Sequence, residues 1–278
     1  MATTPRKRYH TPANVVELLD RVVAAAADTA LYSAKLGERR GVDSIDDIRS
    51  IPVTSLAELR GQHMTDTLAR PGEVEWIVGP RMGRRRPALA VAEGVEQTGA
   101  RYDVFRDALR EVDPDALLKR CAVVSSPERR YFAAEISTIL GYVGIQAHVF
   151  SDTDRERTRG VLRVLSPELV VVLSDWLDRP DLPPRTQLCV TFNGGARLLE
   201  GGQLDMFHID ELGFLGHSTD GEQWILYNDL YLYERSDTGR LVVTALHNLV
   251  QPLLRIETEV IGEALGAALS RRDDKPSG

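Results

Sequence analysis

The chain is short of lysine, of cysteine and of long apolar runs. Its 34 basic residues include only four lysines, Lys7, Lys35, Lys119 and Lys275, and this arginine bias is typical of a GC-rich bacterial genome. No run of roughly 18 apolar residues occurs, and no apolar run follows the basic N-terminus, so we expect neither a membrane span nor a leader. With 278 residues, 43% of them hydrophobic, the chain is expected to be a cytoplasmic protein with a substantial core.

Positive charge is also scarce. The 41 acidic residues outnumber the 34 basic ones and give a net charge of -7, which argues against a nucleic-acid binder because the phosphate backbone favours basic surfaces. Any anion site must therefore be local. Cys121 and Cys189 each lie in an apolar, strand-like run, which predicts two buried thiols in preference to a disulfide or a metal pair.

The N-terminal part is predicted to be helical. After a disordered basic tail at residues 1–10, the segment from Thr11 to Leu36 has the pattern of one long amphipathic helix. A short helix, a break at Ile51-Pro52 and a second helix should follow. Thr54 or Ser55 is expected to cap that second helix.

Residues 93–185 alternate between helical and strand-like patterns. This alternation predicts a doubly wound, mainly parallel sheet, although any Rossmann-like protein shows the same pattern. The expected helices lie at 94–118, 128–144 and 153–165, and the expected strands at 121–126, 145–150 and 168–174.

Three β-rich runs follow between Trp224 and Val260. They are separated by the turn Ser236–Gly239 and by Gln251-Pro252, so they predict a hairpin and a returning strand. Four aromatic side chains alternate along the first run and suit either a sheet core or the lining of an aryl or acyl pocket: Trp224, Tyr227, Tyr231 and Tyr233.

The segment from Gly239 to Thr258, which spans the second and third runs, resembles a known motif, G-x-L-V-V-T-x-L-x-x-x-x-x-P-L-I-R-Y-x-T-G-D. It ends the large domain of adenylate-forming ligases of the phenylacetate-CoA ligase type. The matching residues are Gly239, Leu241, Val242, Val243, Thr244, Leu246, Pro252, Leu253, Arg255 and Thr258. Two N-terminal segments, Leu31–Lys35 and Ile48–Arg60, are also similar to passages of that family, in the same order.

The resemblance implies the family's large N-terminal domain over residues 11–260. Its α/β subdomains would occupy residues 11–185, and a smaller β-rich subdomain residues 186–260. Residues 261–278 would form a terminal helix and a tail. Two further segments carry the likeness: Asn193–Ala196 resembles a G-G-E turn that approaches the nucleotide, and Phe207–Gly213 is similar to Y-G-L-T-E-M-G. The implied substrate-binding residues are Gly194, Gly195, Phe207, Gly213 and Arg255.

Several positions depart from the family's pattern for ATP. The phosphate loop is expected at Gly79–Pro87, which contains no serine or threonine. Its four arginines could bind a phosphate or carboxylate, or could form a solvated basic loop: Arg81, Arg84, Arg85 and Arg86. Asp210 replaces the family's threonine, which adds negative charge near a phosphate, and His208 replaces a glycine.

The motif's end departs as well. Val260 occupies the place of an aspartate that in the family holds the ribose hydroxyls, and valine accepts no hydrogen bond. Only 18 residues follow Val260 (278 minus 260), so we expect the family's C-terminal lid to be absent. These departures predict that ATP does not bind and that the protein has no cofactor.

His208, Asp210 and Glu211 form the candidate catalytic cluster. A histidine beside carboxylates is a common acid/base combination near neutral pH. His217 could join Asp210 and Glu211 as a metal ligand, but the preferred expectation is no metal. The alternative is that these histidines only pack or form hydrogen bonds.

Two classes of function follow. The first is a degenerate ligase-like protein that binds a small acyl or aryl acid, or assists an enzyme of a bacterial biosynthetic pathway, without adenylation. The second is an ATP-independent enzyme that uses His208, Asp210 or Glu211 on an acyl or aryl substrate. A third, less favoured, is a ligase completed by a lid from another chain. Partners would be the small acid or the pathway enzyme, or a second copy in a homodimer.

Overall fold

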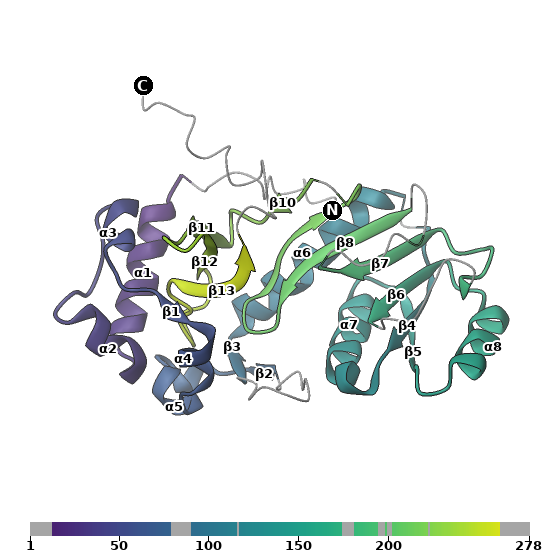
Figure 1. Ribbon diagram of the computed structural model, residues 1–278, viewed down its shortest axis with the longest axis horizontal. Coiled ribbons are helices and arrows are strands. Elements are labelled where there is room, and N and C mark those ends of the chain that lie inside the picture. The colour runs from purple at the N-terminus through teal and green to yellow at the C-terminus, as the bar shows by residue number, and fades with distance from the viewer. Residues whose placement is uncertain are drawn as a thin grey trace, which may run out of the picture. The chain divides into compact units, whose positions relative to one another are not determined.

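The computed structural model describes the chain in seven stretches (Figure 1): residues 13–78, 90–115, 117–173, 181–193, 198, 202–221 and 223–261. The chain divides into two compact units. Unit 1 comprises Met1–Pro80, Pro87–Ala100 and Ile225–Gly278, and unit 2 comprises Arg81–Arg86 and Arg101–Trp224. The expected subdomain boundary at residues 185 and 186 stays a prediction. In the described stretches, no helix combines the length and apolarity that a bilayer span requires.

The first helical segment of unit 1 is broken in two. In place of one helix from Thr11, the described residues form α1 (Val15–Ala27) and α2 (Ala30–Leu36), so the expectation of a single helix was wrong. The break is at Thr29, whose backbone is extended (φ -100°, ψ 148°) and whose hydroxyl accepts a hydrogen bond from Tyr32 N. A hydroxyl that satisfies a first-turn N–H starts a new helix, and this local bond outweighs the helix propensity of the surrounding residues.

Three short helices follow in unit 1: α3 (Ile45–Arg49), α4 (Leu56–Arg60) and α5 (Met64–Thr67). The first two confirm the predicted pair on either side of the Ile-Pro break. Ser55 caps α4 by accepting a hydrogen bond from Glu58 N at 3.0 Å, as one of the two expected caps.

The C-terminal part of unit 1 is a four-stranded sheet in the order β1-β13-β12-β11. β11 and β12 form an antiparallel hairpin and β13 returns antiparallel to β12, which confirms the predicted hairpin and returning strand. β1 pairs in parallel with β13, so Thr54 lies opposite Ile256. The strands are β1 (Thr54–Ser55), β11 (Tyr231–Arg235), β12 (Arg240–Ala245) and β13 (Ile256–Ile261).

A buried glutamine joins distant segments of unit 1. Gln251 is fully buried, accepts a hydrogen bond from Ala92 N at 2.6 Å and donates one to Thr67 Oγ1 at 2.8 Å. Since a buried amide without partners would cost free energy, these bonds fix the segment that precedes β13. The remaining short elements are η1 (Pro71–Glu73), β2 (Trp76–Val78), β3 (Val91–Glu93) and β10 (Ile225–Leu226).

Unit 2 is built on a mixed sheet whose strands follow the order β9-β8-β7-β6-β4-β5. All neighbours from β5 to β8 pair in parallel, and β9 pairs antiparallel with β8. This confirms the predicted mainly parallel sheet. The strands are β4 (Arg120–Ser125), β5 (Gln146–Ser151), β6 (Leu169–Leu173), β7 (Leu188–Phe192), β8 (Gln203–Ile209) and β9 (Gly213–Ser218).

The helices of unit 2 connect its parallel strands. α7 leads from β4 outward to β5, whereas α8 leads from β5 back past β4 to β6. Because such crossovers are right-handed, the opposite directions place α7 and α8 on opposite faces of the sheet. The elements are α6 (Val95–Val112), which begins in unit 1, η2 (Pro127–Arg129), α7 (Arg130–Tyr142) and α8 (Arg155–Leu165).

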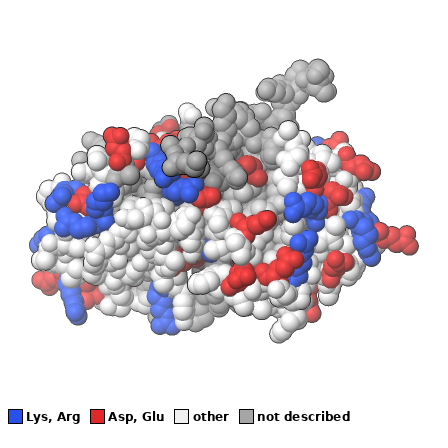
Figure 2. All heavy atoms as spheres, turned by 180° about the vertical axis from the view of Figure 1, so that it is seen from behind, with Lys and Arg blue, Asp and Glu red and all other residues white. Residues whose placement is uncertain are grey.

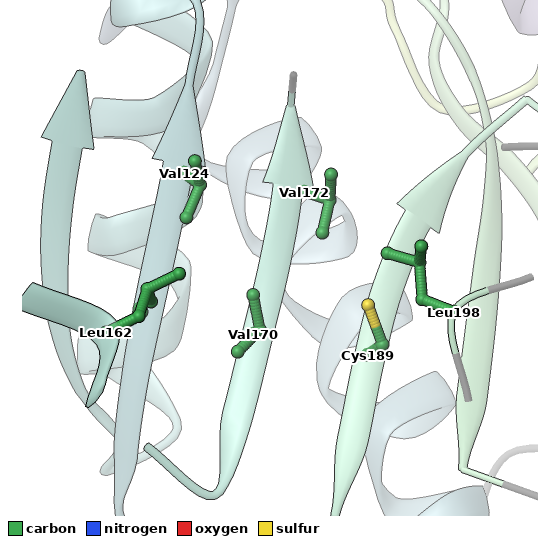
Figure 3. Packing of buried hydrophobic residues seen from close by; sticks show 7 residues of the cluster. Val124, Leu162, Val170, Val172, Cys189 and Leu198 are labelled. Carbon is green, nitrogen blue, oxygen red and sulfur yellow. The ribbon is translucent and has the colours of Figure 1, made fainter. Parts of the chain in front are cut away.

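The core under α8 is apolar throughout (Figure 3). Leu162 of α8 packs in one cluster with residues of β4, β6 and β7, among them Val124, Val170 and Cys189. All five residues of β6 are buried, as expected for a strand covered on both faces. Cys121 and Cys189 are free and buried, which confirms the prediction of structural thiols, and burial raises the pKa of Cys189 to about 12.

Charges of both signs occur on the face drawn in Figure 2. On the face drawn in Figure 2, acidic and basic side chains are interspersed, with no field of one sign. The net charge of -7 is therefore not gathered into a single acidic patch on that face.

Candidate functional site

The candidate site of unit 2 lies where β7 and β8 end. Because the two strands are parallel, Asn193, just after β7, reaches His208 near the end of β8. The Asn193 side chain accepts a hydrogen bond from His208 N at 2.8 Å and donates one to His208 O at 2.9 Å. Asn193 has φ 58°, in the left-handed region that asparagine tolerates. In α/β sheets ligands bind beyond the carboxyl ends of parallel strands, so this edge is the candidate site.

The imidazole of His208 is enclosed by phenylalanine rings. It stacks on Phe132 of α7 with ring centroids 4.6 Å apart, and it contacts Phe214 edge-on at 5.1 Å and Phe192 edge-on at 6.4 Å. Its side chain is only 3% exposed. Among the described residues the ring is thus packed against aromatic side chains, and its predicted acid/base role stays a prediction.

Asp210 and Glu211 lie in the turn between β8 and β9. Gly213 follows the turn with φ 85°, a conformation that glycine adopts readily. Asp210 is half exposed, and its Oδ1 lies 3.6 Å from His208 Nδ1. Glu211 is buried. Of the three predicted acid/base residues, Asp210 is therefore the one that solvent reaches readily.

His217 pairs with Glu111 of α6. Its Nε2 lies 3.1 Å from Glu111 Oε2, at the end of α6, and the histidine side chain is 1% exposed. Across the part of the chain that the structure describes, no three His, Cys, Asp or Glu side chains are grouped so that they could hold a metal ion. β9 brings His217 to Glu111 of α6, so the described side chains do not group His217 with Asp210 and Glu211.

Phe207 and His208 are consecutive on β8, so their side chains point to opposite faces of the sheet. Phe207 is buried and packs against Trp224 with ring centroids 5.7 Å apart and ring planes tilted by 58°. The ring predicted to contact substrate is thus in contact with a second aromatic ring of unit 2. A substrate contact for Phe207 stays a prediction.

Arg255, in unit 1, lies in a dense network of hydrogen bonds. Its Nε donates to Glu234 Oε2 at 3.2 Å, and its Nη1 donates to Arg49 O at 2.6 Å and to Ile51 O. Its φ of 49° is unusual for a residue with a side chain. The guanidinium joins β11 to the segment around Ile51, an architectural role that the sequence did not reveal. Its predicted role in substrate binding stays a prediction.

The three segments that carry the specific resemblance meet inside unit 1. Lys35 Nζ donates to Thr54 Oγ1 at 2.9 Å and to Glu58 Oε2 at 2.8 Å. The Tyr32 hydroxyl accepts a hydrogen bond from Leu254 N at 3.1 Å, and burial raises the pKa of Tyr32 well above its usual value. The sequence indicated no role for Tyr32 or Lys35. The similarity of the segment Leu31–Lys35 to a passage of the family was the feature that could have pointed to them.

Val260 lies on β13 and is half-buried. Its backbone N–H donates to the hydroxyl of fully buried Thr258 at 3.2 Å, so that hydroxyl is engaged with the main chain. The other predicted binding residues fall outside the described residues. These are the two glycines Gly194 and Gly195 and the four arginines Arg81, Arg84, Arg85 and Arg86.

Comparisons place this fold among known structures. The sequence itself matches no family model and no curated protein. A 2-hydroxyisobutyryl-CoA ligase in complex with 2-HIB-AMP and CoA superimposes with a TM-score of 0.69 at 15% identity, covering 90% of this chain and 64% of that chain. The same ligase with R3-HIB-AMP gives 0.68 at 14% identity, covering 92% and 66%.

A third structure, the AtGH3.15 acyl acid amido synthetase in complex with 2,4-DB, gives a TM-score of 0.54 at 10% identity and covers 93% of this chain and 68% of that chain. The chain thus has the fold that these adenylate-forming enzymes share, as the resemblance implied. It spans 64% and 66% of the length of the two ligase chains.

Proposed function

We propose that this chain binds a small acyl or aryl carboxylic acid and does not form an acyl adenylate from ATP. The shared fold supports an acid as ligand, because the similar structures are a 2-hydroxyisobutyryl-CoA ligase and an acyl acid amido synthetase. The observation that carries the proposal is the half-exposed carboxylate of Asp210 in the turn after β8.

Asp210 stands where the resemblance places a neutral threonine beside a nucleotide phosphate. Two like charges about 4 Å apart repel each other by about 1 kcal/mol in water and by about 4 kcal/mol in the less polar surroundings of a protein surface. ATP carries several such charges. A carboxylate at this position therefore opposes binding of a triphosphate.

Val260 adds a second, independent penalty. The resemblance implies a carboxylate here that accepts hydrogen bonds from ribose hydroxyls, and the valine on β13 accepts none. A hydrogen bond to a charged group contributes about 1.5–3 kcal/mol, so its loss weakens nucleotide binding by about tenfold or more. Together the two residues favour an ATP-independent function.

Titration calorimetry with ATP and magnesium tests the proposal. We expect no heat of binding from the wild-type protein and measurable binding from the double variant Asp210→Thr, Val260→Asp, because it restores both groups of the family's pattern. Asp237→Thr makes the same charge change in an exposed turn elsewhere and should bind no ATP. Micromolar ATP binding by the wild type, or release of pyrophosphate, would contradict the proposal.

The ligand is tested with the same protein. Benzoate, phenylacetate and 2-hydroxyisobutyrate should be titrated singly, and at least one should raise the melting temperature while the matching amide does not. If neither these acids nor longer acyl acids raise the melting temperature, the proposal that the chain binds a carboxylic acid is wrong. The conclusion about ATP would not be affected.

A second candidate is an ATP-independent enzyme. The contact of 3.6 Å between His208 Nδ1 and Asp210 Oδ1 favours it, because a carboxylate can orient an imidazole for proton transfer. The enclosure of the ring weighs against it. Hydrolysis of acyl esters or amides, abolished by His208→Phe, would support this candidate over simple binding.

A further inference from the structure

The strand β5 is the outermost strand of the sheet of unit 2 among the described residues. Its sequence, Gln-Ala-His-Val-Phe-Ser, contains no charged residue, no proline and no glycine. It pairs with β4 without a bulge along all six residues. Natural proteins usually protect an edge strand by a charge, a proline, a bulge or a short length, and β5 has none of these.

The hydrogen bonds to β4 show which groups of β5 face the open edge. Gln146 N donates to Lys119 O at 2.9 Å, and Asp152 N donates to Ser125 O at 3.0 Å. Because bonding direction alternates along a strand, the even-numbered residues bond to β4. The N–H and C=O groups of the odd-numbered residues, Ala147, Val149 and Ser151, therefore point to the open edge.

Val149, at the centre of the outward-facing residues of β5, is itself exposed, at 46%. Pairing of β5 with a second strand would bring apolar side chains against this one.

We propose that two copies of this chain pair through β5 as antiparallel strands, with the two-fold axis at Val149. Val149 is the middle of the three residues whose polar groups face outward, so an axis there brings all three into register. Ala147 of one copy lies opposite Ser151 of the other, and the two sheets continue into one. An interface built from one patch in both subunits is the usual arrangement of a homodimer.

Side chains agree with this register. It sets His148 of one copy opposite Phe150 of the other, on the same face of the joined sheet. Within one chain these two rings already lie nearly parallel, with centroids 6.5 Å apart and planes at 20°. Aromatic pairs directly across antiparallel strands stabilise a sheet, and two symmetry-related pairs form here.

Charge at the two ends of β5 is also complementary. Asp152 and Asp154 follow the carboxyl end of β5. At its amino end, the carbonyl of Lys119 accepts the hydrogen bond from Gln146 N. Antiparallel pairing brings the carboxyl end of one strand beside the amino end of the other. The axis therefore places acidic residues of each copy near a lysine of its mate, and β5 itself sets no charge opposite a like charge.

Sedimentation of the full chain, from low micromolar to sub-millimolar concentration, tests the dimer. Val149→Pro removes the outward N–H at the axis and leaves every β5 hydrogen bond to β4 intact, since a proline is tolerated where its nitrogen faces solvent. We expect it to weaken self-association by about tenfold or more, because two symmetry-related hydrogen bonds are lost. Val149→Thr keeps the N–H and the shape and should dimerise like the wild type.

Circular dichroism must first show that both variants fold. Hydrogen exchange supplies a readout at the strand itself: the amides of Ala147 and Ser151 should be protected at high protein concentration and lose protection on dilution. A wild-type protein that stays monomeric throughout overturns the proposal, as does a dimer that Val149→Pro leaves unchanged. Binding of an acidic extended peptide along β5 in preference to self-association would overturn it too.

Discussion

The buried network around Arg255 in unit 1 and the end of β8 in unit 2 use polar side chains differently. In unit 1, Arg255, Gln251 and Tyr32 are buried, and their hydrogen bonds join segments that are far apart in the sequence. In unit 2, His208 near the end of β8 packs among aromatic rings, and Asp210 in the following turn is half exposed. The first arrangement tolerates few substitutions, because each buried polar group depends on a partner.

The difference explains where the resemblance to the ligases is specific. The motif from Gly239 to Thr258 and the two N-terminal segments meet in unit 1, where they hold the fold together. The end of β8 and the turn after it, where the family's pattern places contacts to phosphate, carry the changes at His208 and Asp210. A motif can therefore persist as an element of architecture, and its presence alone does not indicate the chemistry.

The largest effect is expected from Arg255→Met. It leaves the Glu234 carboxylate buried without its guanidinium, and breaking a buried ion pair in this way costs about 3–5 kcal/mol. Urea denaturation measures the loss. Arg240→Met, which removes an arginine that is 52% exposed and 4.0 Å from Glu257, should cost less than about 1 kcal/mol. Equal costs for the two variants would contradict the architectural role of Arg255.

An intermediate effect is expected from acid. His247 of unit 1 is half-buried; burial lowers its pKa to about 4 from the ordinary 6.5, although the hydrogen bond to Leu230 O acts to raise it. The folded protein then binds fewer protons than the unfolded chain between these values. The contribution of His247 to the free energy of unfolding is fully present above pH 6.5 and is lost as the pH falls toward 4. This contribution is on the order of 2 kcal/mol.

Unfolding free energies between pH 7 and pH 4 measure this slope. His247→Gln cannot titrate, so it should flatten the part of the slope that belongs to this residue. An unchanged slope in the variant would show that other groups cause the acid sensitivity.

The smallest effect is expected from His208→Phe. Phenylalanine extends the cluster of Phe132, Phe192 and Phe214, and the contact of 3.6 Å to half-exposed Asp210 is lost, so stability should change by less than about 1.5 kcal/mol. His208→Ala leaves a cavity and should cost about 2 kcal/mol or more. Thermal unfolding separates the two variants. A large loss for Phe would show that His208 has an essential polar role.

Much of the fold could be predicted from local patterns. Apolar and β-rich runs predicted strands in both units, and the turn at Ser236–Gly239 predicted the β11–β12 hairpin. The break at Thr29 was missed, because one hydroxyl bond to Tyr32 N decided it against helix propensity. For the candidate site, His208, Asp210 and Glu211 are neighbours along the chain, but the sequence contains no sign of their different exposure.

The sequence by itself determined the parallel sheet of unit 2, the motif at Gly239 to Thr258 and the residues at positions 210 and 260, because these depend on residue type and on spacing along the chain. Only the tertiary structure decided what surrounds each side chain. Phe132 stacks on His208, Glu111 pairs with His217 and Glu234 pairs with Arg255. In each case the partner comes from another element. The physical reason is that burial and hydrogen bonding depend on distance in space, which a local pattern does not contain.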